Sequence, residues 1–351
     1  MTDAPRALRA GVVGLGMMGR NHVRVWDEVI TDVELVAVAD PDPEAVRRAT
    51  TGRAARGHAD PATMFAEERL DLVSIVAPTS LHLPVTLAAI EAGINVLVEK
   101  PIASNRGEAE QMIAASERAG TILTVGHIER FNPAVRELKR RLAEGELGRI
   151  FQVTATRLGP FPARIRDVGV VIDLAPHDLD VMRYLVGSEP VRLYAETEQR
   201  IHTEHEDLFN GIMKFANGVV GILDINWLTP TKRRVLTVTG ERGMYVADYI
   251  NQDLVHYANP DAGHTWENRG GDGTSAPITS VAEGEMTRRY VRKQEPLVVE
   301  LSEFAEAVRS GGPAPVSPRD GMIALLLARK MVEAGRTGEV IAGSALQEAL
   351  A

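Results

Sequence analysis

The chain has 351 residues, of which 44% are hydrophobic and 25% charged, ordinary values for a globular protein with a sizeable core. Its formal net charge of −9 disfavours nucleic acid as a partner, so any phosphate would have to be bound by a local basic pocket. The absence of cysteine excludes disulfides, thiolate metal sites and cysteine nucleophiles. No apolar run approaches the roughly 20 residues of a membrane helix, so we expect a cytoplasmic protein without a membrane partner.

The first predicted element is a buried strand, Leu8–Val13, followed by a glycine loop. The loop "GLGMMG" places Gly14, Gly16 and Gly19 in G-x-G-x-x-G spacing. The first glycine of such a loop permits a tight turn, the second lets the backbone approach a pyrophosphate, and the third lets helix and strand pack closely. The next helix starts at Met17 and Met18, where free N–H groups would face the phosphates.

A second predicted strand, Glu34–Asp40, ends in an acidic residue. A carboxylate at this point would accept hydrogen bonds from the ribose hydroxyls of the adenosine and would repel a 2′-phosphate. The sequence therefore favours NAD over NADP. The alternative is that Asp40 only caps the next helix, which begins near Asp42-Pro43.

Strands and helices alternate through residue 125, with strands expected at 71–77, 95–99 and 121–125 and helices at 81–92 and 105–119. Nearly continuous apolar strands of this kind predict a parallel sheet covered on both faces, a Rossmann domain over residues 1–125. Ligands bind such sheets at the carboxyl ends of the strands. Further residues predicted to lie along this edge are Pro78, Thr79, His82, Glu99, Lys100 and Pro101.

The pattern changes in residues 126–351, which we expect to form a second domain for substrate binding and oligomerisation. Two strands, Leu208–Phe215 and Val219–Trp227, flank a turn at Asn217-Gly218, a strong hairpin signal. This domain is predicted as a large, mainly antiparallel open sheet covered by helices on one face. A helix at 320–334 could pack back on the first domain. The open face predicts a homodimer or homotetramer.

Four segments, "GLGMMGRNH", "VEKP", "GHIERFNP" and "DLAPHDLD", resemble in order and spacing the Gfo/Idh/MocA oxidoreductase family, over nearly the whole chain. The segments "GHIERFNPAVRELK" and "NWLTPTKRR" are most similar to its UDP-N-acetylglucosamine 3-dehydrogenase branch. The resemblance implies hydride transfer from a sugar hydroxyl to NAD, with a nucleotide sugar as substrate. The alternatives are a dehydrogenase of a free sugar or cyclitol such as inositol, and a non-catalytic ligand-sensing regulator of the same fold.

The resemblance also implies that Lys100, Asp173 and His177 are catalytic. The hydroxyl must lose its proton as the hydride leaves, and His177 suits this because its ordinary pKa lies near physiological pH. The Lys100 ammonium would donate to the substrate oxygen and stabilise alkoxide charge. Which of the two removes the proton stays open, with His177 favoured. Asp173 would bind a substrate hydroxyl or orient the imidazole.

Other residues are predicted to bind the ligands. His82 and Arg130 are assigned to the cofactor, and Asn132 and Lys232 to the substrate. For Lys232 the alternative is a solvated strand end.

Two arginines, Arg157 and Arg164, could hold a diphosphate, because the guanidinium fork matches phosphate oxygens. The segment "IHTEHED" contains His202, His205 and three acids but has no recognised metal spacing, so no metal site is predicted.

Overall fold

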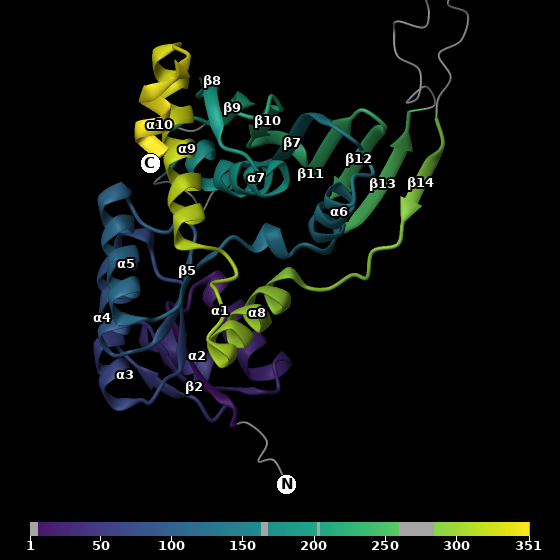
Figure 1. Cartoon of the computed structure of the whole chain (residues 1–351). Coiled ribbons are helices and arrows are strands. Elements are labelled where there is room, and N and C mark those ends of the chain that lie inside the picture. Colours follow the sequence, from purple (N-terminus) through teal and green to yellow (C-terminus); the bar gives the residue numbers. More distant parts are fainter. Residues whose placement is uncertain (1–5, 163–167, 202–203, 260–283, 351) are drawn as a thin grey trace, which may run out of the picture. The chain divides into compact units, whose positions relative to one another are not determined.

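The computed structural model describes residues 6–162, 168–201, 204–259 and 284–350 (Figure 1). The chain divides into two compact units, the first formed by Met1–Phe131 and Gln294–Leu327 and the second by Asn132–Lys293 and Ala328–Ala351. The boundary predicted after residue 125 therefore falls inside the first unit, to which the chain returns after residue 293. Each unit is described by itself below.

The first unit contains a six-stranded parallel sheet of strand order β3-β2-β1-β4-β5-β6. Its strands are β1 (Leu8–Val13), β2 (Val33–Ala39), β3 (Arg56–His58), β4 (Leu72–Ile75), β5 (Asn95–Glu99) and β6 (Leu123–Gly126). Its helices include α1 (Met17–Arg24), α2 (Pro43–Thr50), α3 (Pro61–Glu67), α4 (His82–Glu91), α5 (Arg106–Ala119) and α8 (Pro296–Ser310). This sheet confirms the predicted Rossmann fold and brings the ends of β1, β2, β4 and β5 to one edge.

Helix starts in the first unit follow from local sequence. Asp42, Asp60 and Asn105 each cap a helix by accepting a hydrogen bond from a backbone N–H of its first turn. Such a cap contributes about 1 kcal/mol to helix stability. Gly120 ends α5 with a φ of 67°, a left-handed conformation that glycine adopts without steric cost.

Helix α8 belongs to the first unit because its apolar face completes that unit's core. Leu297, Leu301 and Phe304 are buried in the same cluster as Trp26 of the segment that follows α1. The returning chain is also tied to β6, since the Thr124 hydroxyl donates to a backbone carbonyl of the segment between α8 and α9 at 2.9 Å.

The second unit contains a nine-stranded sheet of order β14-β13-β12-β11-β7-β10-β9-β8-β15, antiparallel except between β7 and β10. Its strands are β7 (Ile150–Pro160), β8 (Pro190–Glu198), β9 (Leu208–Phe215), β10 (Val220–Asn226), β11 (Leu228–Gly240), β12 (Gly243–Asp248), β13 (Asp253–Ala258), β14 (Met286–Arg289) and β15 (Ile341–Ala342). Its helices are α6 (Pro133–Ala143), α7 (Val170–Val186), α10 (Ser344–Leu350) and the end of α9 (Pro318–Thr337).

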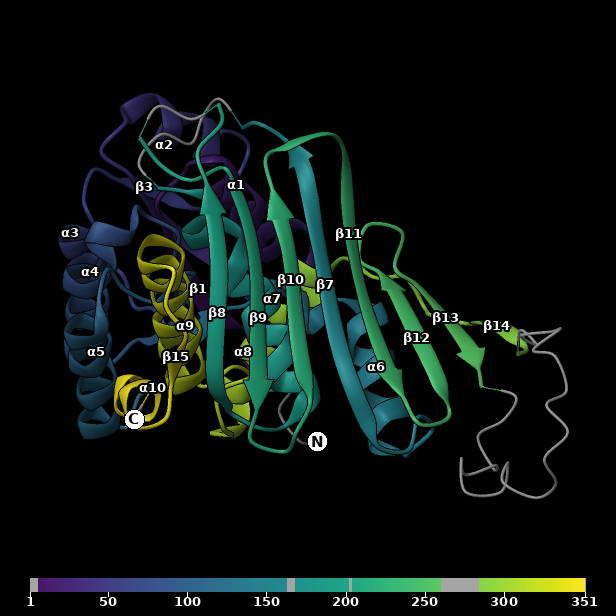
Figure 2. The ribbon, with the colours of Figure 1, turned by 90° about the horizontal axis from the view of Figure 1, so that it is seen from above.

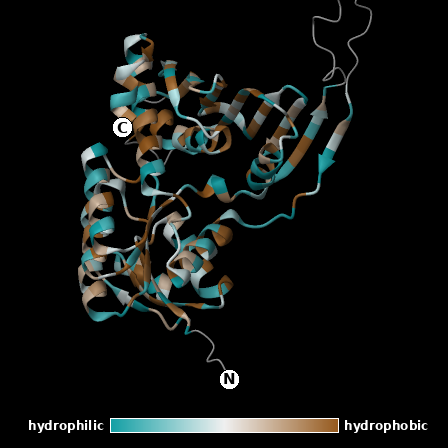
Figure 3. Ribbon diagram, in the orientation of Figure 1, coloured by the Kyte–Doolittle hydropathy of each residue, from teal (hydrophilic) through white to brown (hydrophobic). Residues whose placement is uncertain are grey.

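The sheet of the second unit is covered on one face by α6 and α7, and Figure 2 looks onto its other face. Buried residues alternate with half-buried or exposed ones along β9, and with half-buried ones along β10. Figure 3 shows that the strands of this sheet carry both hydrophobic and hydrophilic residues. β9 and β10 form the predicted hairpin, with Gly218 at a φ of 90° in its turn. None of the described helices is long and apolar enough to cross a membrane.

Candidate active site

The glycine loop between β1 and α1 has the geometry that its spacing predicted. Gly14 has a φ of +88°, and a Cβ atom there would lie 2.6 Å from the carbonyl oxygen of Val76. A Cβ on Gly19 would lie 1.9 Å from the carbonyl oxygen of Gly14, so α1 packs directly on the loop. A Cβ on Gly16 would meet nothing within 4 Å, which leaves its backbone open to a ligand. The loop can therefore hold a pyrophosphate at the start of α1.

Asp40 and the first residues of α1 occupy the positions expected for cofactor contacts. Met17 and Met18 begin α1, where backbone N–H groups have no helical acceptor. The Asp40 carboxylate accepts hydrogen bonds from the backbone N–H of Leu15 at 2.6 Å and of Asp42 at 2.8 Å. Asp42, and not Asp40, caps α2. Asp40 thus fixes the glycine loop at the end of β2, and its contact with a ribose stays a prediction.

The segment after β4 contains Pro78, Thr79 and His82. Pro78 and Thr79 begin a short 3-10 helix at the edge of the sheet. His82 is instead buried, and its ring nitrogens lie 2.9 Å from the carbonyl oxygens of Ala77 and Pro101. Burial lowers the pKa of His82 below its ordinary value. The ring is enclosed between the segments that follow β4 and β5, and the contact of His82 with the cofactor stays a prediction.

Glu99 and Lys100 lie at the end of β5, and the peptide bond from Lys100 to Pro101 is cis. The Glu99 carboxylate lies 3.2 Å from Nε2 of His22 and also accepts the backbone N–H of Lys100 at 3.2 Å. A Cβ on Gly126 would lie 3.0 Å from this carboxylate, so glycine at the end of β6 makes room for it. Glu99 was predicted to bind the cofactor, but its carboxylate is directed into the unit, where it supports the turn that carries Lys100.

Two residues near residue 131 have partners within their own units. Arg130 forms an ion pair with Asp320 at 3.2 Å in the first unit. Asn132 is buried in the second unit, where it caps α6 through the N–H of Ala134 and donates to the carbonyl oxygen of Tyr249. Asn132 was predicted to bind substrate, and this is a correction, because its amide is committed to the backbone.

Helix α7 carries Asp173 and His177 four residues apart, on successive turns of one helix. Helix α7 begins at Val170 and includes Pro176. Proline at this point has no N–H to donate within the helix, so the helical ladder is interrupted between Asp173 and His177. Both side chains are half-buried.

Arg157 is buried on β7, where its guanidinium makes two hydrogen bonds to Asp178 of α7, at 2.6 and 3.1 Å. The guanidinium also lies 5.7 Å from the centre of the Tyr249 ring. This corrects the prediction that Arg157 holds a diphosphate, because its side chain is enclosed and paired with a buried carboxylate. Arg164, the second arginine of that prediction, lies outside the described residues.

Lys232 is exposed on β11. Its Cγ atom lies 3.7 Å from the position of a Cβ on Gly159, so the lysine stem lies across the neighbouring end of β7. Lys232 thus keeps the exposure that its predicted substrate contact requires.

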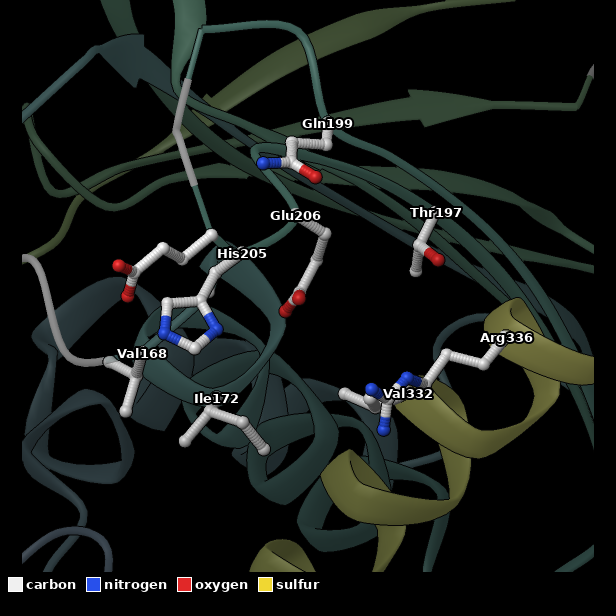
Figure 4. Close-up of a pocket in the computed structure, with 10 residues that line it drawn as sticks. Val168, Ile172, Thr197, Gln199, His205, Glu206, Val332 and Arg336 are labelled. Atoms are coloured by element: carbon white, nitrogen blue, oxygen red, sulfur yellow. The ribbon is translucent and has the colours of Figure 1, made fainter.

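The start of α7 borders a cavity of about 450 Å³ within the second unit. The cavity is lined by Val168, Gly169, Ile172, Thr197, Gln199, Glu204, His205, Glu206, Val332 and Arg336 (Figure 4). Glu206 accepts the backbone N–H groups of Val170 and Val171 through its carbonyl and carboxylate oxygens, at 2.9 and 3.3 Å. Among the described residues no three His, Asp or Glu side chains are grouped as a metal site. Through these two hydrogen bonds Glu206 fixes the start of α7, the helix that carries Asp173 and His177.

Sequence reasoning missed several residues that support the candidate site. His22, Asp178 and Glu206 lie in segments in which other residues carry the functional signal, and Gly126 lies at a strand end without any turn signal. An interior histidine on the helix after a glycine loop was a usable signal for His22. The pairing of Arg157 with Asp178 has no signal in the sequence, because strand β7 and helix α7 meet only through the tertiary fold.

Two family models match the chain. The model described as an oxidoreductase family with an NAD-binding Rossmann fold matches residues 8–127, and the GFO/IDH/MocA C-terminal domain matches residues 135–246.

Among curated relatives, the UDP-N-acetylglucosamine 3-dehydrogenase of Acidithiobacillus ferrooxidans is 29% identical over 93% of this chain and 98% of its own length. The myo-inositol 2-dehydrogenase of Thermotoga maritima is 25% identical over 94% of this chain and 98% of its own length. A solved structure of the Acidithiobacillus enzyme aligns with a TM-score of 0.82 at 26% identity, covering 95% of this chain and 99% of that one. The protein thus belongs to the Gfo/Idh/MocA family of NAD-binding oxidoreductases.

Proposed function

We propose that the protein oxidises the 3-hydroxyl of a UDP-N-acetylhexosamine of the UDP-N-acetylglucosamine type to a ketone, as a step toward an amino sugar. The observation that carries this proposal is the pair of functional elements: Lys100 at the end of β5, beside Glu99, and Asp173 with His177 on successive turns of α7. A similar UDP-N-acetylglucosamine 3-dehydrogenase, matched over almost its full length, supports the substrate class.

The roles of the residues follow from the charges that develop during the reaction. NAD, when bound, supplies the hydride acceptor. His177 takes the proton of the hydroxyl as the C–H bond is broken, and Lys100 donates a hydrogen bond to the same oxygen. Asp173 holds a neighbouring hydroxyl or the imidazole. If Lys100 instead removes the proton, His177 donates the hydrogen bond to the substrate oxygen, and both residues are still required.

Asp40 supports NAD as the cofactor in preference to NADP. Its carboxylate is fixed at the end of β2 by two backbone N–H groups, and a 2′-phosphate near this point would meet a negative charge. The glycine loop beside it supports binding of the pyrophosphate common to both cofactors.

A second candidate is a free-sugar or cyclitol dehydrogenase. The similar myo-inositol 2-dehydrogenase favours it, and so does the loss of Arg157 as a phosphate ligand. A ligand-sensing regulator is disfavoured because the chain retains both Lys100 and His177.

The substrate class is tested by mixing the protein and NAD separately with UDP-N-acetylglucosamine, UDP-N-acetylglucosaminuronic acid and myo-inositol, and following absorbance of the reduced nicotinamide. The proposal predicts a rise with a UDP-sugar. A rise with inositol alone would replace the nucleotide sugar with a cyclitol. If none of the three reacts, calorimetric binding of NAD decides whether the cofactor assignment stands.

A further inference from the structure

Three titratable side chains converge in the interior of the first unit, beside the turn that carries Lys100. His22 comes from α1, Glu99 from the end of β5 and Glu300 from α8. His22 is 0% exposed and Glu300 is 2% exposed. His22 Nε2 and Glu99 Oε1 are 3.2 Å apart, and the backbone N–H of Lys100 donates to the same carboxylate. An isolated charge in the interior costs folding free energy, so the charges of this cluster must be compensated within it.

The surroundings act in opposite directions on the pKa values of the two carboxyl groups. Burial acts to raise the pKa of Glu99, but the hydrogen bond and charge of His22, with the charge of Lys100, hold that pKa below its ordinary value. Burial raises the pKa of Glu300 well above its ordinary value, and the charge of Glu99 raises it further. Neither Glu300 oxygen has a hydrogen-bond partner in the described part of the chain. An ionised Glu300 would therefore lack any compensating group there.

The charged and titratable groups that face Glu99 come from each surrounding element. They are His22 on α1, Lys100 next in the chain, His82 at the start of α4 and Glu300 on α8. The charge that acts on Glu300 is that of Glu99. A single negative charge, on Glu99, is thus compensated by His22 and Lys100.

We propose that His22, Glu99 and Glu300 form a buried proton-holding cluster that positions Lys100, with Glu99 ionised, His22 donating to it and Glu300 kept as a neutral acid. Glu99 precedes Lys100 in the chain and accepts its backbone N–H. The hydrogen bond from His22 therefore fixes both the turn and the position of the Glu99 charge beside the Lys100 ammonium. His22 and Glu300 are positioning residues, since neither is argued to touch substrate. The role toward Lys100 rests on the proposed function, whereas the protonation states do not.

The first test uses thermal unfolding of Glu300→Gln between pH 5 and pH 8. In the unfolded chain Glu300 ionises near its ordinary value of 4.5, but in the folded chain it stays protonated. Folding therefore takes up a proton above pH 4.5, and wild-type stability falls as pH rises toward the raised folded pKa. The glutamine side chain does not ionise, so it adds no such pH dependence to the stability of the variant. The melting temperature of the variant should exceed that of wild type by a few degrees at pH 8, and the gap should close toward pH 5.

The matched control is Glu306→Gln on the same helix, whose side chain is 68% exposed and which should show no such growing gap. A Glu300→Gln variant that is less stable than wild type by the same amount at every pH would overturn the neutral state of Glu300.

The second test compares His22→Gln, which keeps a donor for Glu99, with His22→Leu, which removes it. Without the donor, kcat should fall about tenfold or more, and the acid limb of the kcat–pH profile should move to higher pH. The glutamine variant should recover most of the rate, and calorimetry should show NAD affinity little changed in both. Equal losses in the two variants, or none in either, would overturn the positioning role. If no substrate is turned over at all, the proposed function fails while the unfolding experiment still decides the cluster.

Discussion

Replacing Asp178 by alanine should destabilise the second unit strongly. Asp178 and Arg157 are each 2% exposed and are joined by hydrogen bonds of 2.6 and 3.1 Å. Without the carboxylate, the guanidinium stays buried without its ionic partner, which costs about 3–5 kcal/mol. At about 2–4 °C per kcal/mol for a unit of this size, the melting temperature should fall by about 6–20 °C. Urea unfolding followed by far-UV circular dichroism gives the free energy, and calorimetry gives the melting temperature.

Two further variants make this experiment decisive. Glu198→Ala removes an ion pair with Arg200 whose side chains are 52% and 61% exposed, and it should cost less than about 1 kcal/mol. The double variant Arg157→Met with Asp178→Leu replaces the pair by apolar side chains and should recover much of the loss. If Asp178→Ala costs no more than Glu198→Ala, the buried pair does not stabilise β7 against α7.

Three other predictions concern the cofactor loop and the open sheet face. Gly14→Ala should abolish NAD binding in calorimetry, because its Cβ would lie 2.6 Å from the carbonyl oxygen of Val76; unchanged affinity would refute the tight turn. Asp40→Asn keeps an acceptor for the loop but removes the charge, so the ratio of kcat/KM with NADP to kcat/KM with NAD should rise about tenfold. A constant ratio would refute discrimination against NADP by the Asp40 charge. We expect light scattering to show a dimer or tetramer that Ile212→Asp, at an exposed position of β9, dissociates; a monomeric wild type would contradict this.

Local sequence was sufficient for features that depend on backbone conformation and hydrophobic period. Gly14 and Gly19 could be assigned correctly because a turn with positive φ and a close approach of helix to strand each demand glycine. The hairpin at Gly218 is also local, because its turn involves only a few consecutive residues.

The sequence was insufficient wherever a side chain could serve either a ligand or the interior. Arg157 and Asn132 carry groups suited to a phosphate or a sugar, and only the tertiary fold reveals their buried partners, Asp178 and the backbone near Tyr249. A charge pattern does not encode burial, so an arginine on an alternating strand was read as accessible. His22, the side-chain partner of Glu99, is likewise distant in sequence, and its pairing with Glu99 is set by the tertiary fold.

The proposed catalysis by Lys100 and His177 is tested most directly by the rate of NAD reduction by Lys100→Ala and His177→Ala with the productive sugar. Each variant should lose about 10²- to 10⁴-fold in kcat, since each removes a group that is proposed to act on the substrate oxygen. NAD binding should persist, and the control Lys293→Ala, at a side chain 61% exposed, should keep the wild-type rate. Rates within tenfold of wild type in both variants would contradict catalysis by Lys100 and His177.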